Sequence, residues 1–347
     1  MIKIANRYVS FNKPCFIIAE AGVNHNGRLD LAFKLVDAAV ASGTNAVKFQ
    51  TFKAESLVVH NAVKAEYQQL STGDNESQLE MIRRLELTYE EFDKIKAYCR
   101  KKKIVFLSTP FDRDSADFLD DLGVSAFKIS SGEITNYPLL QHIASKGKPI
   151  ILSTGMSYLG EVEKALEMIY KCNNRKIILL HCVSNYPAAP MDVNLRAMKT
   201  MSEAFRVPVG YSDHTLGIEV SLAAVALGAC VLEKHLTLDR KLIGPDHEAS
   251  LEPNELRSLV KGVRMIESAM GNGCKIPSPR EENILMTARR SLVAASDIPA
   301  GALISNEHIA IKRPGTGLPP VMISHLIGRK VRQAIKADTL LELDMFS

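Results

Sequence analysis

Ala46-Val-Lys-Phe-Gln-Thr-Phe52 decides the fold, because it is a short, mostly apolar run that carries Lys48 and Gln50 within it. A strand with one covered face alternates apolar and polar residues, whereas a continuous apolar run indicates a strand covered on both faces. Similar runs recur at Phe16–Gly22, Val105–Phe111, Ala126–Ser131, Pro149–Gly155, Ile177–Val183, Val207–Asp213 and Cys230–Leu238. The sequence therefore predicts eight buried parallel strands.

Stretches of helical period lie between these runs, for example Leu29–Ala41 and Glu161–Tyr170. Eight strand-helix units that close on themselves form a (β/α)₈ TIM barrel, which is the predicted fold. A doubly wound open sheet also alternates in this way, but it usually has a GxGxxG turn after its first strand. Glu20-Ala-Gly-Val-Asn-His-Asn-Gly27 does not match that turn, so the pattern favours the barrel.

The end of the chain differs in composition from the barrel. Gly, Pro and charged residues dominate after Gly271, and short strands are indicated at Ser291–Ala295 and His308–Lys312. We therefore predict a catalytic barrel domain at 1–272, a linker at 273–286 and a small β-rich domain at 287–347. About sixty residues bury little core alone, so this domain is expected to dock on a barrel.

Composition excludes several classes of protein. The net charge is +4 over 347 residues and no long basic run occurs, which argues against nucleic-acid binding. No stretch approaches the roughly 18 apolar residues of a membrane span. The six cysteines form no CxxC pair, which is typical of reduced thiols in the cytoplasm. We expect a cytoplasmic enzyme or binding protein that does not associate with membranes.

Polar side chains end nearly every predicted strand. They are Glu20, Lys48, Gln50, Thr109, Lys128, Ser131, Glu133, Ser153, His181, Ser212, His214, Glu233 and His235. The carboxyl ends of barrel strands converge on one mouth, where catalytic groups collect. The long segment between the second and third strands has helical spacing at Ala65–Thr72 and Asn75–Leu87, and we expect it to cover part of that mouth.

These residue types allow three kinds of chemistry, each with a structural alternative. His214 and His235 on neighbouring strands could bind a divalent metal, or could be hydrogen-bonded rim histidines. Lys48 and Lys128 with nearby hydroxyl groups could hold a phosphate and a carboxylate, or could be structural ion-pair partners of glutamates. The glutamates at the mouth could transfer protons, and the sequence does not decide which one acts.

Several motifs together resemble the N-acetylneuraminate (sialic acid) synthase family. They are Ala19-Glu-Ala-Gly-Val-Asn-His-Asn-Gly27, Val47-Lys-Phe-Gln-Thr51, Leu107-Ser-Thr-Pro-Phe111, Phe127-Lys-Ile-Ser-Ser-Gly-Glu133, Leu152-Ser-Thr-Gly-Met156, Gly210-Tyr-Ser-Asp-His214, Leu232-Glu-Lys-His235 and Gly244-Pro-Asp246. The stretch Lys312-Arg-Pro-Gly-Thr-Gly317 is similar to the antifreeze-like SAF domain that ends these synthases. The resemblance thus covers both predicted domains.

The resemblance implies a role for each matching residue. Phosphoenolpyruvate would be bound by Lys48, Thr109, Lys128, Ser131 and Ser212, with Ser184 standing where the family often has Asn or Thr. The amino sugar would be bound by Gln50, Glu133, Tyr186, Asp246 and Arg313, and His214 and His235 would hold Mn²⁺, with Mg²⁺ or Co²⁺ as alternatives. Glu133 and Glu20 would be catalytic. Arg313 would reach the partner's site in a homodimer whose SAF domains lie over each other's barrels.

The implied reaction condenses phosphoenolpyruvate with N-acetylmannosamine and water to give N-acetylneuraminate and phosphate. The alternative acceptor is a 2,4-diacetamido-2,4,6-trideoxyhexose, as in N,N'-diacetyllegionaminate or pseudaminate synthases. Two other readings of the residues stay open at this point. Lys128 could form a Schiff base with pyruvate, as in a class I aldolase, or the chain could be a carbohydrate-binding protein without catalytic activity.

Overall fold

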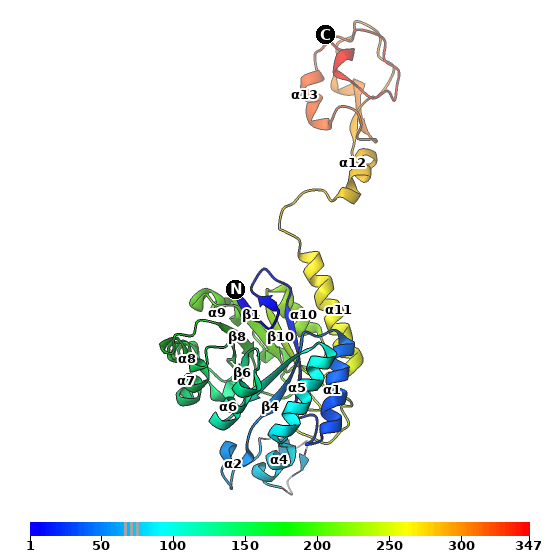
Figure 1. Cartoon of the computed structure of the whole chain (residues 1–347). Coiled ribbons are helices and arrows are strands. Elements are labelled where there is room, and N and C mark those ends of the chain that lie inside the picture. Colours follow the sequence, from blue (N-terminus) through cyan, green and yellow to red (C-terminus); the bar gives the residue numbers. More distant parts are fainter. Residues whose placement is uncertain (66–67, 70–71, 74–75) are drawn as a thin grey trace. The chain divides into compact units, whose positions relative to one another are not determined.

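The computed structural model describes residues 1–65, 68–69, 72–73 and 76–347. These residues form two compact units, Met1–Gly271 and Asn272–Ser347, and each is described by itself. In the first unit, helices surround a sheet of parallel strands (Figure 1). This architecture confirms the predicted barrel.

The barrel sheet has eight strands in the order β5-β4-β3-β10-β9-β8-β7-β6. Its strands are β3 (Phe16–Gly22), β4 (Ala46–Thr51), β5 (Val105–Pro110), β6 (Phe127–Ile129), β7 (Ile150–Ser153), β8 (Ile177–Cys182), β9 (Val209–Asp213) and β10 (Val231–His235). All neighbouring pairs are parallel, and the two edge strands β5 and β6 lie next to each other, which nearly closes the sheet. Each strand overlaps one of the eight predicted runs.

Helices alternate with these strands along the chain. They are α1 (Leu29–Ser42), α2 (Ala54–Leu57), α4 (Gln78–Leu85), α5 (Tyr89–Lys102), α6 (Arg113–Leu122), α7 (Tyr137–Ser145), α8 (Leu159–Lys171), α9 (Ala197–Phe205), α10 (Glu219–Ala226) and α11 (Pro253–Met270), with short η1 (Ser131–Glu133) and η2 (Pro190–Asp192). Local signals set their ends, as in α5, which begins with a Thr88–Glu91 capping box. In the described part of the chain no helix has both the length and the apolar character to cross a membrane.

A hairpin covers the end of the barrel at which the strands begin. Strands β1 (Ile2–Ile4) and β2 (Arg7–Val9) pair antiparallel, and their buried side chains Ile2, Ile4 and Val9 pack on the apolar residues at the start of the barrel strands. Sequence periodicity did not reveal this hairpin because each strand has three residues. It leaves the carboxyl ends of the strands as the open mouth.

The second unit is a small β-rich domain. Strands β11 (Ser291–Ala294) and β12 (Ile309–Lys312) pair antiparallel at two of the predicted strand positions. Its helices are α12 (Glu282–Ala288) and α13 (Ile323–Leu326), with η3 (Pro279–Glu281), η4 (Asn306–His308), η5 (Pro320–Met322) and η6 (Leu343–Met345). Leu292, Ile298, Val331 and Leu341 belong to its own apolar core.

An ion pair between neighbouring strands stabilises the barrel wall. Lys234 on β10 donates to Asp213 Oδ2 on β9 at 2.9 Å, and both side chains are fully buried. Asp213 also accepts from Ser221 on α10 and from Thr215. The pair therefore links two strands to the helix outside them, and each charge depends on the other.

We expect Lys234→Met to destabilise the protein by about 3 kcal/mol, because it leaves the Asp213 carboxylate buried without its countercharge. The measurement is the urea midpoint of unfolding followed by circular dichroism. Lys199→Met is the matched control, since its ion pair with Glu203 is exposed and contributes about 0.5 kcal/mol or less. Equal midpoints for the two variants would contradict this interpretation.

Candidate active site

The mouth of the barrel contains a cavity with a volume of about 470 Å³. Fourteen of the residues singled out from the sequence line it: Glu20, Lys48, Gln50, Thr109, Lys128, Ser131, Ser153, Ser184, Tyr186, Ser212, His214, Glu233, His235 and Asp246. Strand register explains part of this convergence, since His235 pairs with Glu20 and Glu20 pairs with Lys48. Side chains that are far apart in sequence therefore lie side by side at one level of the barrel.

Two lysines and two glutamates alternate along the floor of the cavity. Lys48 Nζ lies 2.8 Å from Glu20 Oε2 and 3.7 Å from Glu233 Oε2, and Glu233 Oε1 lies 3.6 Å from Lys128 Nζ. All four side chains are at most 6% exposed. A buried charge is costly unless it is paired, so each ion is held by its neighbours. We call Glu20, Lys48, Glu233 and Lys128 the charged row.

The charged row separates the protonation behaviour of its two carboxyl groups. Burial raises the pKa of Glu20 to about 7, although Lys48 opposes this rise. Burial also acts to raise the pKa of Glu233, but Lys128 and Lys48 outweigh it and hold that pKa below its ordinary value. Burial lowers the pKa of Lys128. Near neutral pH, Glu20 can therefore both accept and donate a proton, whereas Glu233 stays ionised.

Hydroxyl groups surround the two ammonium groups. Lys48 Nζ donates to Thr109 Oγ1 at 3.0 Å, and Lys128 Nζ donates to Ser153 Oγ at 2.8 Å. Ser212 Oγ donates to Glu233 Oε1 at 2.9 Å. Cations and hydroxyl donors in one cavity form a site for a small anion with several oxygens. Ser153 and Glu233 were visible as polar strand ends, but only their contacts place them in this site.

Gly155 lets two further serines approach the cavity. A Cβ atom at this position would lie 2.3 Å from Ser184 Oγ and 2.8 Å from Ser131 Oγ. The backbone N–H of Gly155 donates to Ser131 Oγ at 3.0 Å. The missing side chain thus leaves the space into which both hydroxyl groups point.

The imidazole rings of His214 and His235 line the same cavity as the charged row. His214 Nδ1 donates to the Val183 carbonyl at 2.6 Å, which leaves the Nε2 lone pair facing the cavity side chains. His235 Nδ1 lies 3.9 Å from Asp246 Oδ2 and has no hydrogen-bond partner within the described part of the chain. The two ring centroids are 5.6 Å apart, and Tyr186 packs against both rings.

These rings have the properties of metal ligands. Burial lowers the pKa of His214 to about 4 and that of His235 well below its ordinary value, so both are neutral. Burial raises the pKa of Asp246 to about 6. Among residues 1–65, 68–69, 72–73 and 76–347 no set of three His, Cys, Asp or Glu side chains is gathered for a metal. Two neutral imidazoles could hold a divalent ion only if water or substrate supplied its other ligands.

The wall of the cavity above β3, β4 and β5 is mostly apolar. Helices α2 and α4 pack with Phe52 and Phe111 into a small separate core, and both helices reach the cavity. The lining side chains there are Leu57, Val58, Met81, Ile82 and Leu85, together with Gln68 and Gln78. This confirms that the segment after the second barrel strand covers part of the mouth. Within its predicted helical stretches, residues 66–67, 70–71 and 75 lie outside the described residues.

Two predicted site residues are not part of this lining as the described residues define it. Glu133 ends η1, next to the lining residues Ser131 and Gly132, and its carboxylate accepts a hydrogen bond from Asn136 at 2.7 Å. Arg313 is exposed in the second unit, where its Nε donates to the Ala288 carbonyl at 3.1 Å.

Comparisons with known proteins give matches in both units of the chain. Residues 35–275 match the NeuB family and residues 289–347 match the SAF domain. The chain is 49% identical to N,N'-diacetyllegionaminic acid synthase of Campylobacter jejuni, covering 95% of this chain and 99% of that protein. It is also 49% identical to the synthase of that name from Legionella pneumophila, with 97% and 98% covered.

A solved structure of similar fold is an N-acetylneuraminic acid (sialic acid) synthetase from Leptospira borgpetersenii in complex with citrate. It is 38% identical, has a TM-score of 0.72, and the match covers 82% of this chain and 94% of that one. The fold, the position of the cavity and the family motifs therefore point to one kind of enzyme.

We expect Gly155→Ala to weaken binding of phosphoenolpyruvate, the anion that the resemblance implies, by about tenfold or more, because the new methyl group displaces Ser131 and Ser184. The measurement is isothermal titration calorimetry. Gly160→Ala, at the start of α8 with no atom within 4 Å of the new Cβ, is the control and should bind normally. Normal binding by Gly155→Ala would show that the two serines do not contact the anion.

Proposed function

The chain belongs to the NeuB family and is a phosphoenolpyruvate-dependent enzyme that forms a carbon–carbon bond, and we propose that it makes N,N'-diacetyllegionaminate. The acceptor in this proposal is 2,4-diacetamido-2,4,6-trideoxymannose. N-acetylmannosamine, the acceptor favoured by sequence motifs alone, becomes the alternative, because both of the 49% identical relatives described above carry the diacetyllegionaminic acid synthase name. The family assignment also disfavours the Schiff-base aldolase and the non-catalytic readings.

The apolar wall is the structural observation that supports this acceptor. The trideoxy sugar has a methyl group at carbon 6 and a second acetamido methyl, where N-acetylmannosamine has hydroxyl groups. Leu57, Met81 and Leu85 offer apolar contact on that side of the cavity. Burying methyl groups there is favourable, whereas burying a hydroxyl without a partner costs free energy.

Phosphoenolpyruvate would occupy the polar side of the cavity. Lys48, Lys128, Thr109 and Ser212, with the Ser131–Ser184 pair, would hold its phosphate and carboxylate. The charged row supports this role because its ammonium groups are already desolvated and pre-oriented by glutamates. An incoming anion then replaces carboxylate contacts and does not have to strip water from the lysines.

The reaction joins carbon 3 of phosphoenolpyruvate to the aldehyde carbon of the open-chain sugar, whose oxygen gains a proton. Water adds to carbon 2 and loses a proton, and the tetrahedral intermediate then releases phosphate. We assign proton transfer at the sugar oxygen to Glu133 and proton removal from the water to Glu20, whose raised pKa suits a base near neutral pH. Gln50, Tyr186 and Asp246 would orient the sugar.

His214 and His235 would bind a divalent metal, Mn²⁺ foremost with Mg²⁺ or Co²⁺ as alternatives, which when bound polarises the sugar aldehyde. The neutral state of both rings and the Val183 carbonyl that orients His214 support this assignment. Tyr186 packs against both rings.

We also propose a homodimer in which the SAF domain of one subunit covers the barrel mouth of the other and brings Arg313 to the sugar. The loops around the mouth support this arrangement, because they carry apolar side chains that are more than half exposed: Met156, Tyr158, Met191, Leu216 and Ile243. Such a ring of exposed apolar residues marks a protein contact.

The test of the acceptor measures phosphate release from phosphoenolpyruvate with Mn²⁺ and each of the two sugars. We expect a kcat/KM at least about tenfold higher for the trideoxy sugar, since one or two buried methyl groups contribute about 1 to 2 kcal/mol. A chelator should abolish turnover, and added Mn²⁺ should restore it. Preference for N-acetylmannosamine would make the enzyme an N-acetylneuraminate synthase.

The test of the dimer mixes two variants that are each nearly inactive, Arg313→Ala and His235→Ala. After subunit exchange, half of all dimers in the mixture are heterodimers. If Arg313 serves the partner's barrel, each heterodimer has one intact site out of two, so we expect about a quarter of wild-type activity. Each variant mixed with itself is the control. If Arg313 serves its own barrel, the mixture gains no activity.

A further inference from the structure

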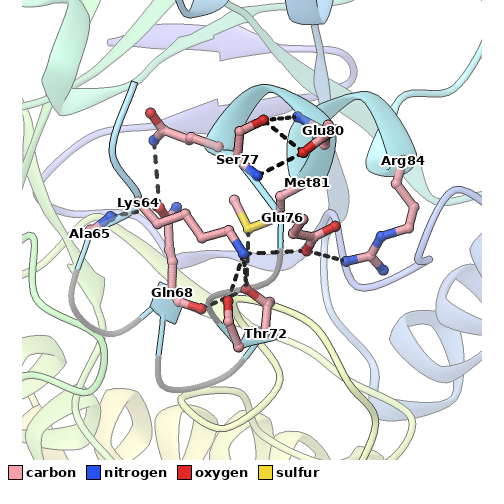
Figure 2. Close-up of polar contacts among 11 residues, drawn as sticks. Lys64, Ala65, Gln68, Thr72, Glu76, Ser77, Glu80, Met81 and Arg84 are labelled. Carbon is pink, nitrogen blue, oxygen red and sulfur yellow. Dashed lines mark hydrogen bonds and ion pairs between the residues drawn. The ribbon is translucent and has the colours of Figure 1, made fainter. Parts of the chain in front are cut away.

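Lys64 is a buried lysine that the proposed reaction does not use. Its side chain is 3% exposed, although it lies outside the barrel strands. The ammonium donates to Thr72 Oγ1 at 3.0 Å and to the Gly73 carbonyl at 2.8 Å, and it pairs with Glu76 Oε1 at 3.4 Å (Figure 2). These three acceptors match the three N–H donors of an ammonium group. Lys64 is therefore saturated by protein atoms and is not poised to bind a ligand itself.

The acceptors of Lys64 connect it to helix α4 and to the cavity wall. Glu76 Oε1 also accepts from Arg84 on α4 at 3.0 Å. Thr72 Oγ1 donates to the Gln68 carbonyl at 2.7 Å and lies 3.7 Å from Met81 Sδ. Gln68 and Met81 both line the cavity. Two successive non-covalent contacts, from Lys64 to Thr72 and from Thr72 to Gln68 or Met81, therefore join the buried ammonium to the wall.

The wall next to Lys64 carries the amide side chains of Gln68 and Gln78 among apolar ones. Gln68 Oε1 accepts from the backbone N–H of Ala65 at 3.0 Å and lies 3.5 Å from Gln78 Nε2. Ala65, Gln68 and Gln78 all line the cavity. A few fixed polar groups on an apolar wall determine how a small ligand is oriented. Their positions follow from the segment that Lys64 holds.

We infer that Lys64 is a positioning residue for the acceptor sugar: its ammonium fixes the Gln68 and Gln78 amides and Met81 on the wall above β3, β4 and β5. The inference rests on the proposed function, because it takes the apolar side of the cavity as the acceptor side. Phosphoenolpyruvate would bind the lysines and hydroxyl groups at the ends of β4 to β9, which Lys64 does not contact in the described part of the chain.

The test is Lys64→Met in the full-length enzyme, which keeps the length of the side chain and removes its three donors. Steady-state phosphate release gives KM separately for each substrate. We expect KM for the acceptor to rise about tenfold or more and KM for phosphoenolpyruvate to change less than about twofold. A purely structural role would lower the amount of active enzyme and leave both KM values unchanged.

Two further variants make the test specific. Arg83→Met removes a cation of α4 whose ion pair with Glu55 is exposed, and both KM values should stay normal. Thr72→Val removes one acceptor of Lys64 and should raise the acceptor KM less than Lys64→Met does, so it serves if Lys64→Met does not fold. Equal changes in both KM values, or no change in folded variants, would overturn the inference.

Wild-type turnover in the same assay separates this inference from the proposed function. No phosphate release by wild-type enzyme with either sugar would contradict the proposed function. Normal wild-type release, combined with an unchanged acceptor KM in Lys64→Met, would contradict the role of Lys64 alone. A fall in the kcat/KM ratio between the two sugars in Lys64→Met would further support it, since a misplaced wall discriminates less well.

Discussion

The charged row at the mouth of the barrel is the constraint on which the site depends. Glu20, Lys48, Glu233 and Lys128 come from four different strands and are nearly excluded from water. Ions in such a place persist only when each has a countercharge at close range. The barrel supplies that range, because its closure brings β6 and β10 face to face across the interior. The fold therefore brings the four charged side chains together, and their two ammonium groups make this end of the barrel suitable for an anion.

The cavity is divided by this arrangement into two chemically different sides. Lysines and hydroxyl groups at the ends of β4 to β9 suit an anion with many oxygens, whereas α2 and α4 place apolar side chains above β3 to β5. The two histidines line the same cavity, and Tyr186 packs against both rings. In the proposed function, this division lets the polar phosphoenolpyruvate and the partly apolar acceptor bind in contact with each other.

Buried lysines have their partners in two different places in this protein. Lys48 and Lys128 pair with carboxylates that line the cavity. Lys64 and Lys234 have acceptors outside that cavity floor. Charge burial is the same in both cases, and in the proposed function the position of the partners separates the lysines that bind a ligand from those that fix a segment.

Sequence alone predicted the eight strands, the barrel and most of the polar residues that line its mouth. Continuous apolar runs that alternate with helical stretches indicate buried parallel strands, and polar residues at strand ends converge when the sheet closes. Only the tertiary structure decided which charges touch, that Gly155 makes room for two serines, and that Lys64 holds the apolar wall. These facts depend on contacts between residues far apart in the chain, and spacing along a sequence does not encode the distance between two side chains.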